Sequence, residues 1–418
     1  MSGNFTGLIN QSLKRSREAT LSVLGINEAG LRTHLAEQMH DRMGEEGCFL
    51  APPVFEHTFG WQPGEVTLAD LQDSLLSKTV VSALTADTGH GFDADMYPYK
   101  HQLESWQTLL ADKPMSAVIT TGTGSGKTEC FMVPILEDLV REYEQQQRPL
   151  VGVRALCLYP LNALINSQRE RLDAWTSPFE EGVRFCLYNG NTKERVPQPH
   201  QHLRPNEVLS RRLLRQQPAP ILMTNATMLE YMLIRQVDEP ILKISREQQS
   251  LRWIVLDEAH TYIGSQAAEL SLLLRRVVEA FGKQASEIRF VATSATIAGE
   301  KAAQRLQTYL ASLAGVPDEQ VVVIGGSRQV PAVTPRKPAN LRLEEISQIE
   351  PDQQVSAKRY AALINHPLAY RLREAVVNNE KPLDLNDLMS VVRSDLESSQ
   401  TAARQQEEFI DLDIVGQA

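Results

Sequence analysis

Residues 121–128 read TGTGSGKT and have the composition of a phosphate-binding loop. An apolar run precedes them and a helical pattern follows, which is the strand–loop–helix context that such a loop requires. Glycine lets the backbone wrap closely around an anion, and the start of the following helix adds partial positive charge. The strict pattern has glycine where Thr121 stands, so the match to a general phosphate-binding loop is incomplete at that position.

Within this loop, two side chains have specific expected roles. Lys127 should reach the β- and γ-phosphates of a nucleotide, and the hydroxyl of Thr128 should bind Mg²⁺. The backbone N–H groups of the loop should point at phosphate oxygens. The sequence therefore predicts a site for ATP and Mg²⁺ made by Thr121, Gly122, Thr123, Gly124, Ser125, Gly126, Lys127 and Thr128.

A second chemical motif, DEAH, follows the apolar run WIVL at residues 253–256. A carboxylate at the end of a buried strand can hold Mg²⁺, and we assign this role to Asp257. The adjacent Glu258 can orient and activate an attacking water. The start of a solvent-exposed helix would also explain the sequence DEAH, but the position of this motif after a buried strand supports the catalytic interpretation. We expect this strand to be the neighbour of the strand that precedes the loop.

The elements that must position these residues lie between residues 96 and 327. Short apolar runs alternate there with helical patterns, which is typical of a doubly wound α/β domain. Runs that are apolar throughout indicate strands buried on both faces, as in a parallel sheet. A helical rhythm at Leu270, Leu273, Leu274, Val277, Val278 and Phe281 predicts a helix that faces the core. The expected strands are 117–120, 153–159, 183–188, 220–224, 253–256, 289–292 and 321–324.

The chain is predicted to have three parts. Residues 1–95 form a helix-rich accessory region, residues 96–327 form the α/β domain, and residues 328–418 form a Pro-rich linker and a helical extension. The polar, Gln- and Glu-rich end at residues 399–418 has a composition typical of disordered segments.

Composition sets limits on the kind of protein. The 418 residues carry a formal net charge of −10, so any binding of nucleic acid has to be local rather than global. The 4 cysteines are scattered, which gives neither zinc-site nor disulfide spacing and indicates buried free thiols. No run of about 18 apolar residues is present, so we expect no membrane span and a cytoplasmic location.

Further segments occur in a fixed order around the loop and the DEAH motif. They are YPYKHQ at 97–102, YPLNAL at 159–164, TNATML at 224–229 and SAT at 294–296. In order and spacing they resemble motifs of the first RecA-like lobe of superfamily 2 DExH-box helicases, where alanine or threonine takes the place of the first glycine. The resemblance covers residues 95–330 and implies a RecA-like parallel sheet and an ATP-driven motor that acts on nucleic acid.

Longer segments narrow the resemblance. YPLNALINSQ, YNGNT, TNATMLEYMLIR and DEAHTYIGSQAAELSLLLRRV are similar to the large bacterial MrfA-like repair helicases and to the Druantia and DISARM phage-defence helicases. This implies DNA, single-stranded or duplex, as the most favoured partner, and it implies other defence-system subunits as further partners. RNA stays an alternative, because reading of the 2′-hydroxyl cannot be seen in a sequence.

The resemblance also implies roles for single residues. Gln102 looks like the adenine-reading glutamine, because its amide offers a paired donor and acceptor, although ordinary packing explains it equally well. His260 should couple the nucleotide state to the SAT segment, with Ser294 and Thr296 as its hydrogen-bond partners. Together with His260, the implied catalytic residues are Glu258, Asp257 and Lys127.

Loops that contact the sugar–phosphate backbone should form the nucleic-acid-binding surface, since motors of this class bind nucleic acid largely without sequence preference. The candidate donors to phosphates are Asn162, Asn166, Gln168, Thr224, Asn225 and Thr227. A local basic segment at 193–215 has two interpretations of equal weight. It either lines a nucleic-acid path or is a solvated helix with paired arginines.

Helicases of this class share the ATP site between two RecA-like lobes, and the second lobe supplies an arginine finger. No Q-x-x-G-R-x-x-R motif follows Thr296, so we expect a second lobe elsewhere in a longer protein and very slow hydrolysis by this chain alone. The alternative class is a nucleotide-gated scaffold that binds ATP and nucleic acid without turnover. The intact DEAH motif argues against it, because a pure binder has no need of Glu258.

Overall fold

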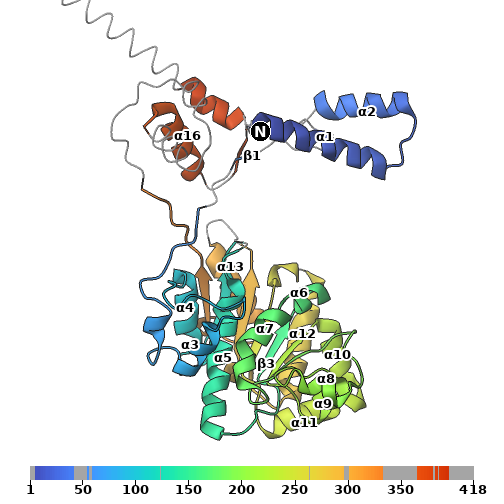
Figure 1. Ribbon diagram of the computed structural model, residues 1–418, viewed down its shortest axis with the longest axis vertical. Helices are drawn as coiled ribbons and strands as arrows, with labels where there is room; N and C mark the ends of the chain where they lie inside the picture. The colour runs from blue at the N-terminus through green and yellow to red at the C-terminus, as the bar shows by residue number, and fades with distance from the viewer. Residues whose placement is uncertain are drawn as a thin grey trace, which may run out of the picture. The chain divides into compact units, whose positions relative to one another are not determined.

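The computed structural model describes residues 5–41, 54–55, 59–122, 124–262, 264–295, 301–332, 365–379, 382–384 and 386–394. The chain divides into two compact units. The sheet unit comprises residues 60–329, and the discontinuous unit comprises residues 1–59 and 330–418. Figure 1 shows the strands of the sheet unit with helices around them.

A seven-stranded parallel sheet forms the centre of the sheet unit, in the order β4-β5-β3-β6-β7-β2-β8. Every strand expected from the sequence is present, with ends that differ by a few residues. The strands are β2 (Ser116–Thr120), β3 (Ala155–Leu158), β4 (Phe185–Leu187), β5 (Ile221–Thr224), β6 (Trp253–Leu256), β7 (Arg289–Ser294) and β8 (Val321–Gly325).

One expectation about this sheet is wrong. The strand before the DEAH motif, β6, is not the neighbour of β2, because β7 lies between them and pairs with both. The reason is the crossover order of the fold, which apolar runs alone do not reveal. Consequently the end of β7 lies between the phosphate-binding loop and the DEAH motif.

Helices cover both faces of the sheet, because alternate residues of each strand belong to two separate apolar clusters. On one face lie α3 (Lys78–Leu84), α4 (Lys100–Leu109), α5 (Lys127–Gln146), α6 (Asn162–Ser167) and α7 (Arg169–Thr176). On the other lie α9 (Arg211–Gln216), α10 (Ala226–Ile234), α11 (Glu239–Glu247), α12 (Ser265–Ala280) and α13 (Ala302–Ala314). The short helix α8 (Gln198–His202) contributes no buried residue. The predicted core-facing residues of α12 are all buried.

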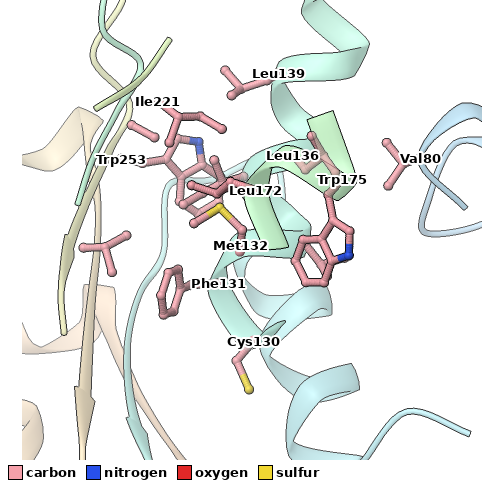
Figure 2. Close-up of a cluster of buried hydrophobic side chains, with 14 of the residues drawn as sticks. Val80, Cys130, Phe131, Met132, Leu136, Leu139, Leu172, Trp175, Ile221 and Trp253 are labelled. Carbon is pink, nitrogen blue, oxygen red and sulfur yellow. The ribbon is translucent and has the colours of Figure 1, made fainter. Parts of the chain in front are cut away.

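The core on the α5 side shows why this helix holds its place. Figure 2 shows side chains of α5 packed with those of α7 and with Ile221 and Trp253 of the sheet. Trp253 is fully buried, and its ring nitrogen donates to Asp138 at 2.7 Å. Because α5 begins at Lys127, this packing fixes the position of the helix start that follows the loop.

Part of the expected N-terminal region belongs to the sheet unit. This unit begins at Gly60, earlier in the chain than the boundary expected near residue 96. The fully buried Glu137 of α5 accepts hydrogen bonds from the backbone N–H and the hydroxyl of Ser77, the N-cap of α3, at 2.9 and 3.0 Å. Trp175 of α7 donates to the carbonyl of His90 at 3.1 Å. These links attach residues 60–95 to the helices that flank the sheet.

The discontinuous unit contains α1 (Phe5–Val23), α2 (Ala29–Asp41), α16 (Pro367–Val377) and an antiparallel pair of short strands, β1 (Val54–Phe55) and β9 (Leu383–Asp384). The expected disordered end at 399–418 lies outside the described residues. Among the described helices, none is long and apolar enough to cross a bilayer. Three of the cysteines, Cys130, Cys157 and Cys186, are buried free thiols, and Cys48 is outside the described residues.

Candidate active site

The phosphate-binding loop connects β2 to α5, as its sequence predicts. Gly124 and Gly126 have φ angles of 72° and 73°, in the left-handed region that L side chains rarely adopt. A Cβ atom at position 126 would lie 2.3 Å from Nε2 of Gln102. Gly126 is therefore required both by the backbone angle and by the close approach of α4. Thr123 lies outside the described residues.

Two buried side chains behind the loop brace it. The hydroxyls of Thr121 and Ser125 are 2.5 Å apart and almost fully buried, so this pair closes the base of the loop. Thr121 thus has a packing role that glycine could not fill. His101 places Nε2 at 2.8 Å from the carbonyl of Ser125, and burial lowers the pKa of its imidazole.

The loop and the DEAH motif meet in one cavity. Nζ of Lys127 is 3.4 Å from Oε1 of Glu258, although the two residues are far apart in sequence. Both line a cavity of about 530 Å³ with Gly124, Ser125, Gly126, Thr128 and Gln102. Aromatic side chains, Phe92, Tyr97 and Tyr99, line it as well. Thr121 and Gly122 are not among the described residues that line it.

The end of β7 supplies a link that the sequence did not predict. Thr293 is fully buried, and its hydroxyl donates to Oδ1 of Asp257 at 2.6 Å. The same hydroxyl oxygen accepts a hydrogen bond from the backbone N–H of Glu258 at 2.9 Å. The register that pairs Leu256 with Ala292 brings the next residue of each strand level, which explains this contact.

The carboxyl group of Asp257 is partly buried, and its negative charge is unfavourable there without a cation beside it. Burial raises the pKa of its carboxyl group, and the neighbouring charge of Glu258 acts in the same direction. A divalent cation at this point would favour the ionised form. Thr128 and Lys127 line the cavity, whereas Asp257 is not among its lining residues and is linked to Glu258 through Thr293. These side chains fit a magnesium–nucleotide, for which Thr128 and Asp257 would provide oxygen ligands and Lys127 a positive charge.

Glu258 has a strained backbone. Its φ of 50° and ψ of 47° are left-handed, which costs a residue with a side chain about 1 kcal/mol. The strain directs the chain into the short helix η4 (Ala259–Thr261). Strain of this kind clusters at functional sites, and here it is held by the hydrogen bond to Thr293.

The expected coupling contact is not made in this structure. Nδ1 of His260 lies 3.2 Å from Oε2 of Glu258 instead of at Ser294. The hydroxyl of Ser294 is buried without a hydrogen-bond partner among the described residues. Thr296, the other expected partner, lies outside the described residues.

The amide of Gln102 is engaged with the backbone. Its Oε1 accepts from the N–H of Tyr99 at 2.9 Å, and its Nε2 donates to the carbonyl of Gly126 at 3.4 Å. The first bond caps α4, and the second joins α4 to the loop. The residue also lines the cavity, so its expected contact with adenine stays a prediction beside this packing role.

Three of the six expected nucleic-acid residues share a second cavity, of about 740 Å³. Asn162, Asn225 and Thr227 line it together with Thr261 and Tyr262, which directly follow the DEAH motif. Nδ2 of Asn225 donates to Oδ1 of Asn162 at 2.8 Å, so the starts of α6 and α10 are joined. This juxtaposition brings segments from three strand ends to one cavity, which is also lined by Glu230, Glu269 and several apolar side chains.

The remaining three residues are placed differently. Asn166 lines a separate cavity with Arg169 and Lys193, and Gln168 accepts a hydrogen bond from Arg171 at 3.2 Å. Thr224 is fully buried, so its hydroxyl cannot reach a phosphate in this conformation. It ends β5, and a residue inside a sheet faces its neighbours rather than solvent.

Several arginines of the basic segment 193–215 have structural partners, which favours the packing interpretation for them. Arg215 pairs with the buried Asp238 at 2.8 Å and with Glu194 at 2.6 Å. Arg211 donates to backbone carbonyls and lies over the ring of Tyr188.

Comparison with known families agrees with this geometry. Residues 99–305 match the family model described as DEAD/DEAH box helicase, a range that includes the loop, the DEAH motif and Thr293. The match covers just under half of the chain and identifies residues 99–305 as a DEAD/DEAH box helicase domain. The fold expected for such a domain is an α/β, RecA-like parallel sheet flanked by helices, and the sheet unit has this fold. Further helices precede and follow the sheet unit along the chain.

Relatives of the helicase domain are longer than this chain. The Druantia protein DruE of Escherichia coli is 24% identical over 427 residues, which cover 77% of this chain and 23% of the relative. The uncharacterized ATP-dependent helicase YprA of Bacillus subtilis is 29% identical over 206 residues, 49% of this chain and 23% of the relative. A crystal structure of the DUF1998 helicase MrfA bound to DNA superposes with a TM-score of 0.45 at 22% identity, over 65% of this chain and 32% of that one.

Three residues of the helicase domain's site were not singled out from the sequence: Thr293, Arg171 and Glu129. Thr293 stands at the polar end of an apolar strand, a position that could have indicated it once the strand order was known. Arg171 and Glu129 line the cavity beside the phosphate-binding loop, but they come from separate helices. Nη2 of Arg171 lies 3.4 Å from Oε1 of Glu129. Only the packing of α7 against α5 brings them together.

Proposed function

We propose that the chain is the nucleotide-binding lobe of an ATP-dependent helicase or translocase that acts on nucleic acid, with DNA as the favoured strand. The observation that carries this is the convergence of Lys127 and Glu258, 3.4 Å apart, in one cavity. A lysine that can neutralise the phosphates and a carboxylate that can orient water are the groups that in-line attack of water on a γ-phosphate uses.

Each residue has a defined task in this proposal. Lys127 neutralises the terminal phosphates, and Glu258 orients the attacking water and accepts its proton. Thr128 and Asp257 would hold Mg²⁺, which when bound neutralises charge on the phosphates. Thr293 positions both Asp257 and the backbone of Glu258 by its two hydrogen bonds.

Nucleic acid is proposed to bind over the cavity lined by Asn162, Asn225 and Thr227. DNA is favoured because the segments of the chain resemble those of MrfA-like and Druantia-type helicases. RNA is the second candidate, since the human ATP-dependent RNA helicase DDX55 is 29% identical over 163 residues. Stimulation of hydrolysis by single-stranded DNA and by single-stranded RNA of the same sequence distinguishes the two.

The proposed partners in a longer protein include a second RecA-like lobe, which would complete the ATP site, and subunits of a defence system. A pathway in phage defence or in repair fits the resemblance equally. The chain spans 23% of the length of both DruE and YprA, so the activity of the whole protein is part of this proposal.

The test is a comparison of Glu258→Gln with Lys127→Ala. We expect Glu258→Gln, made in the longer protein that contains both lobes, to keep ATP binding and to lose at least about 100-fold in single-turnover hydrolysis. Lys127→Ala should lose binding itself, because the phosphate charge is no longer offset. Unchanged hydrolysis in Glu258→Gln would reject the motor in favour of the nucleotide-gated scaffold.

A further inference from the structure

Glu129 lines the nucleotide cavity, and its largely buried carboxylate takes no part in the proposed hydrolysis. Glu129 follows Thr128 in the first turn of α5, and its side chain is 12% exposed. Its Oε1 lies 3.4 Å from Nη2 of Arg171, whose other terminal nitrogen donates to Gln168. Its Oε2 is buried without a hydrogen-bond partner among the described residues.

A buried carboxylate oxygen without a hydrogen-bond donor destabilises the folded chain unless a ligand supplies the missing hydrogen bond. The position of this oxygen says which part of a ligand it meets. Oε2 lies 3.1 Å from the point that a Cβ on Gly126 would occupy, and Nε2 of Gln102 lies 2.3 Å from the same point. The free oxygen of Glu129 therefore lies beside the amide of Gln102.

The nucleotide offers few groups that could satisfy this oxygen. Phosphate oxygens are anionic acceptors, and a carboxylate repels them. The remaining donors are the amino group of the base and the hydroxyls of the sugar. The cavity that contains Glu129 and Gln102 is also lined by Phe92, Tyr97 and Tyr99, whose flat rings suit a base.

We infer that Glu129 accepts a hydrogen bond from the exocyclic amino group of adenine, and that Arg171 holds the carboxylate in place through its other oxygen. Glu129 is thus a specificity-determining residue for the nucleotide, an inference that rests on the proposed function. A base with a carbonyl at this position would place two acceptors against each other, so the site should discriminate against it.

The experiment measures competition rather than turnover. Displacement of a fluorescent ADP from the 418-residue chain is followed with unlabelled ATP, ITP and 2′-deoxy-ATP in the presence of Mg²⁺. ITP has a carbonyl in place of the amino group of ATP and also carries a proton on N1, and the comparison with purine riboside triphosphate below separates the two changes. We expect the wild-type chain to bind ATP at least about tenfold more tightly than ITP, and to bind 2′-deoxy-ATP about as tightly as ATP.

Glu129→Gln should reduce the ratio of ATP to ITP affinity at least about fivefold, because its amide can donate to a carbonyl. Glu104→Gln, the same change at an exposed position of α4, should leave the ratio unchanged. An unchanged ratio of ATP to ITP affinity in Glu129→Gln would overturn the inference. So would a wild-type chain that loses affinity only for 2′-deoxy-ATP, because the carboxylate would then bind the sugar.

Two further arms keep the outcomes distinct. Purine riboside triphosphate has neither the amino group nor the carbonyl, so its affinity for the wild-type chain should lie between those of ATP and ITP. This measurement does not depend on the folding of a variant. Equal affinity for all three bases would overturn the inference while leaving the proposed function intact. Failure of the wild-type chain to bind any nucleotide would instead overturn the proposed function, and this inference with it.

Discussion

Thr293 and Ser294 are adjacent hydroxyl residues at the end of β7, yet the structure gives them opposite surroundings. The hydroxyl of Thr293 makes two hydrogen bonds to the DEAH segment, whereas that of Ser294 is buried with no partner among the described residues. A buried polar group contributes to stability only when it is paired, so neighbouring residues of similar chemistry should respond differently to the loss of a hydroxyl.

We predict that Thr293→Val destabilises the chain by about 1–3 kcal/mol, because it leaves the N–H of Glu258 and the carboxylate of Asp257 unpaired. Ser294→Ala, the matched control, should change the free energy of unfolding by less than about 0.5 kcal/mol, or stabilise the chain. Urea denaturation of both variants measures the difference. Equal losses in the two would show that the hydrogen bonds of Thr293 contribute little.

A second prediction at this scale concerns His101, whose pKa is lowered mainly by burial. The unfolded chain binds a proton there more readily than the folded one. The stability that the neutral imidazole gives is therefore complete above the unfolded pKa of about 6.5, and is lost as the pH falls below it.

His101→Gln keeps a donor near the carbonyl of Ser125 but cannot titrate. Melting temperatures measured between about pH 5 and pH 8 should show the wild-type chain losing stability relative to His101→Gln as the pH decreases. The same pH trend in both proteins would show that His101 is not the group responsible.

At the scale of elements, α5 joins the site to residues 60–95. Its first turn closes the phosphate-binding loop, and its buried Glu137 binds the N-cap of α3. This contact and the packing of Trp175 against Phe92 attach part of the expected accessory region to the sheet unit, which begins at Gly60. The expected accessory region therefore includes a part that supports the helix on which the site is built.

Ser77→Ala removes both the N-cap of α3 and the hydroxyl bond to Glu137, so we predict a loss of about 1–2 kcal/mol in the free energy of unfolding. Ser82→Ala, at an exposed position in the same helix, should be neutral or slightly stabilising, since alanine is the better helix former. Denaturant titrations of the two variants test this, and similar midpoints would refute the proposed attachment of α3.

At the scale of the whole molecule, the nucleotide cavity described here is lined by a single sheet unit. The resemblance to superfamily 2 helicases implies that a second lobe supplies an arginine to the γ-phosphate. An arginine finger contributes about 10³–10⁵ in rate in related phosphoryl-transfer systems. The single lobe then binds the nucleotide and orients the attacking water, but it does not fully stabilise the transition state of hydrolysis.

We accordingly predict that the 418-residue chain binds ATP weakly and hydrolyses it about 10³-fold or more slowly than a protein that contains both lobes. Steady-state phosphate release, measured with and without single-stranded DNA, checks this. Nucleic-acid-stimulated turnover by the purified chain would contradict the prediction.

The sequence alone determined the strands, the phosphate-binding loop and the DEAH motif, because each is a local pattern. Apolar runs report burial, and glycine spacing reports what the backbone can do around an anion. The order of the strands is not local, so it was the tertiary structure that placed β7 between β2 and β6, and with it Thr293 at the site. Side-chain partners were decided in the same way: Thr224 is buried, His260 lies at Glu258, and Arg171 meets Glu129, because packing between distant elements sets each contact.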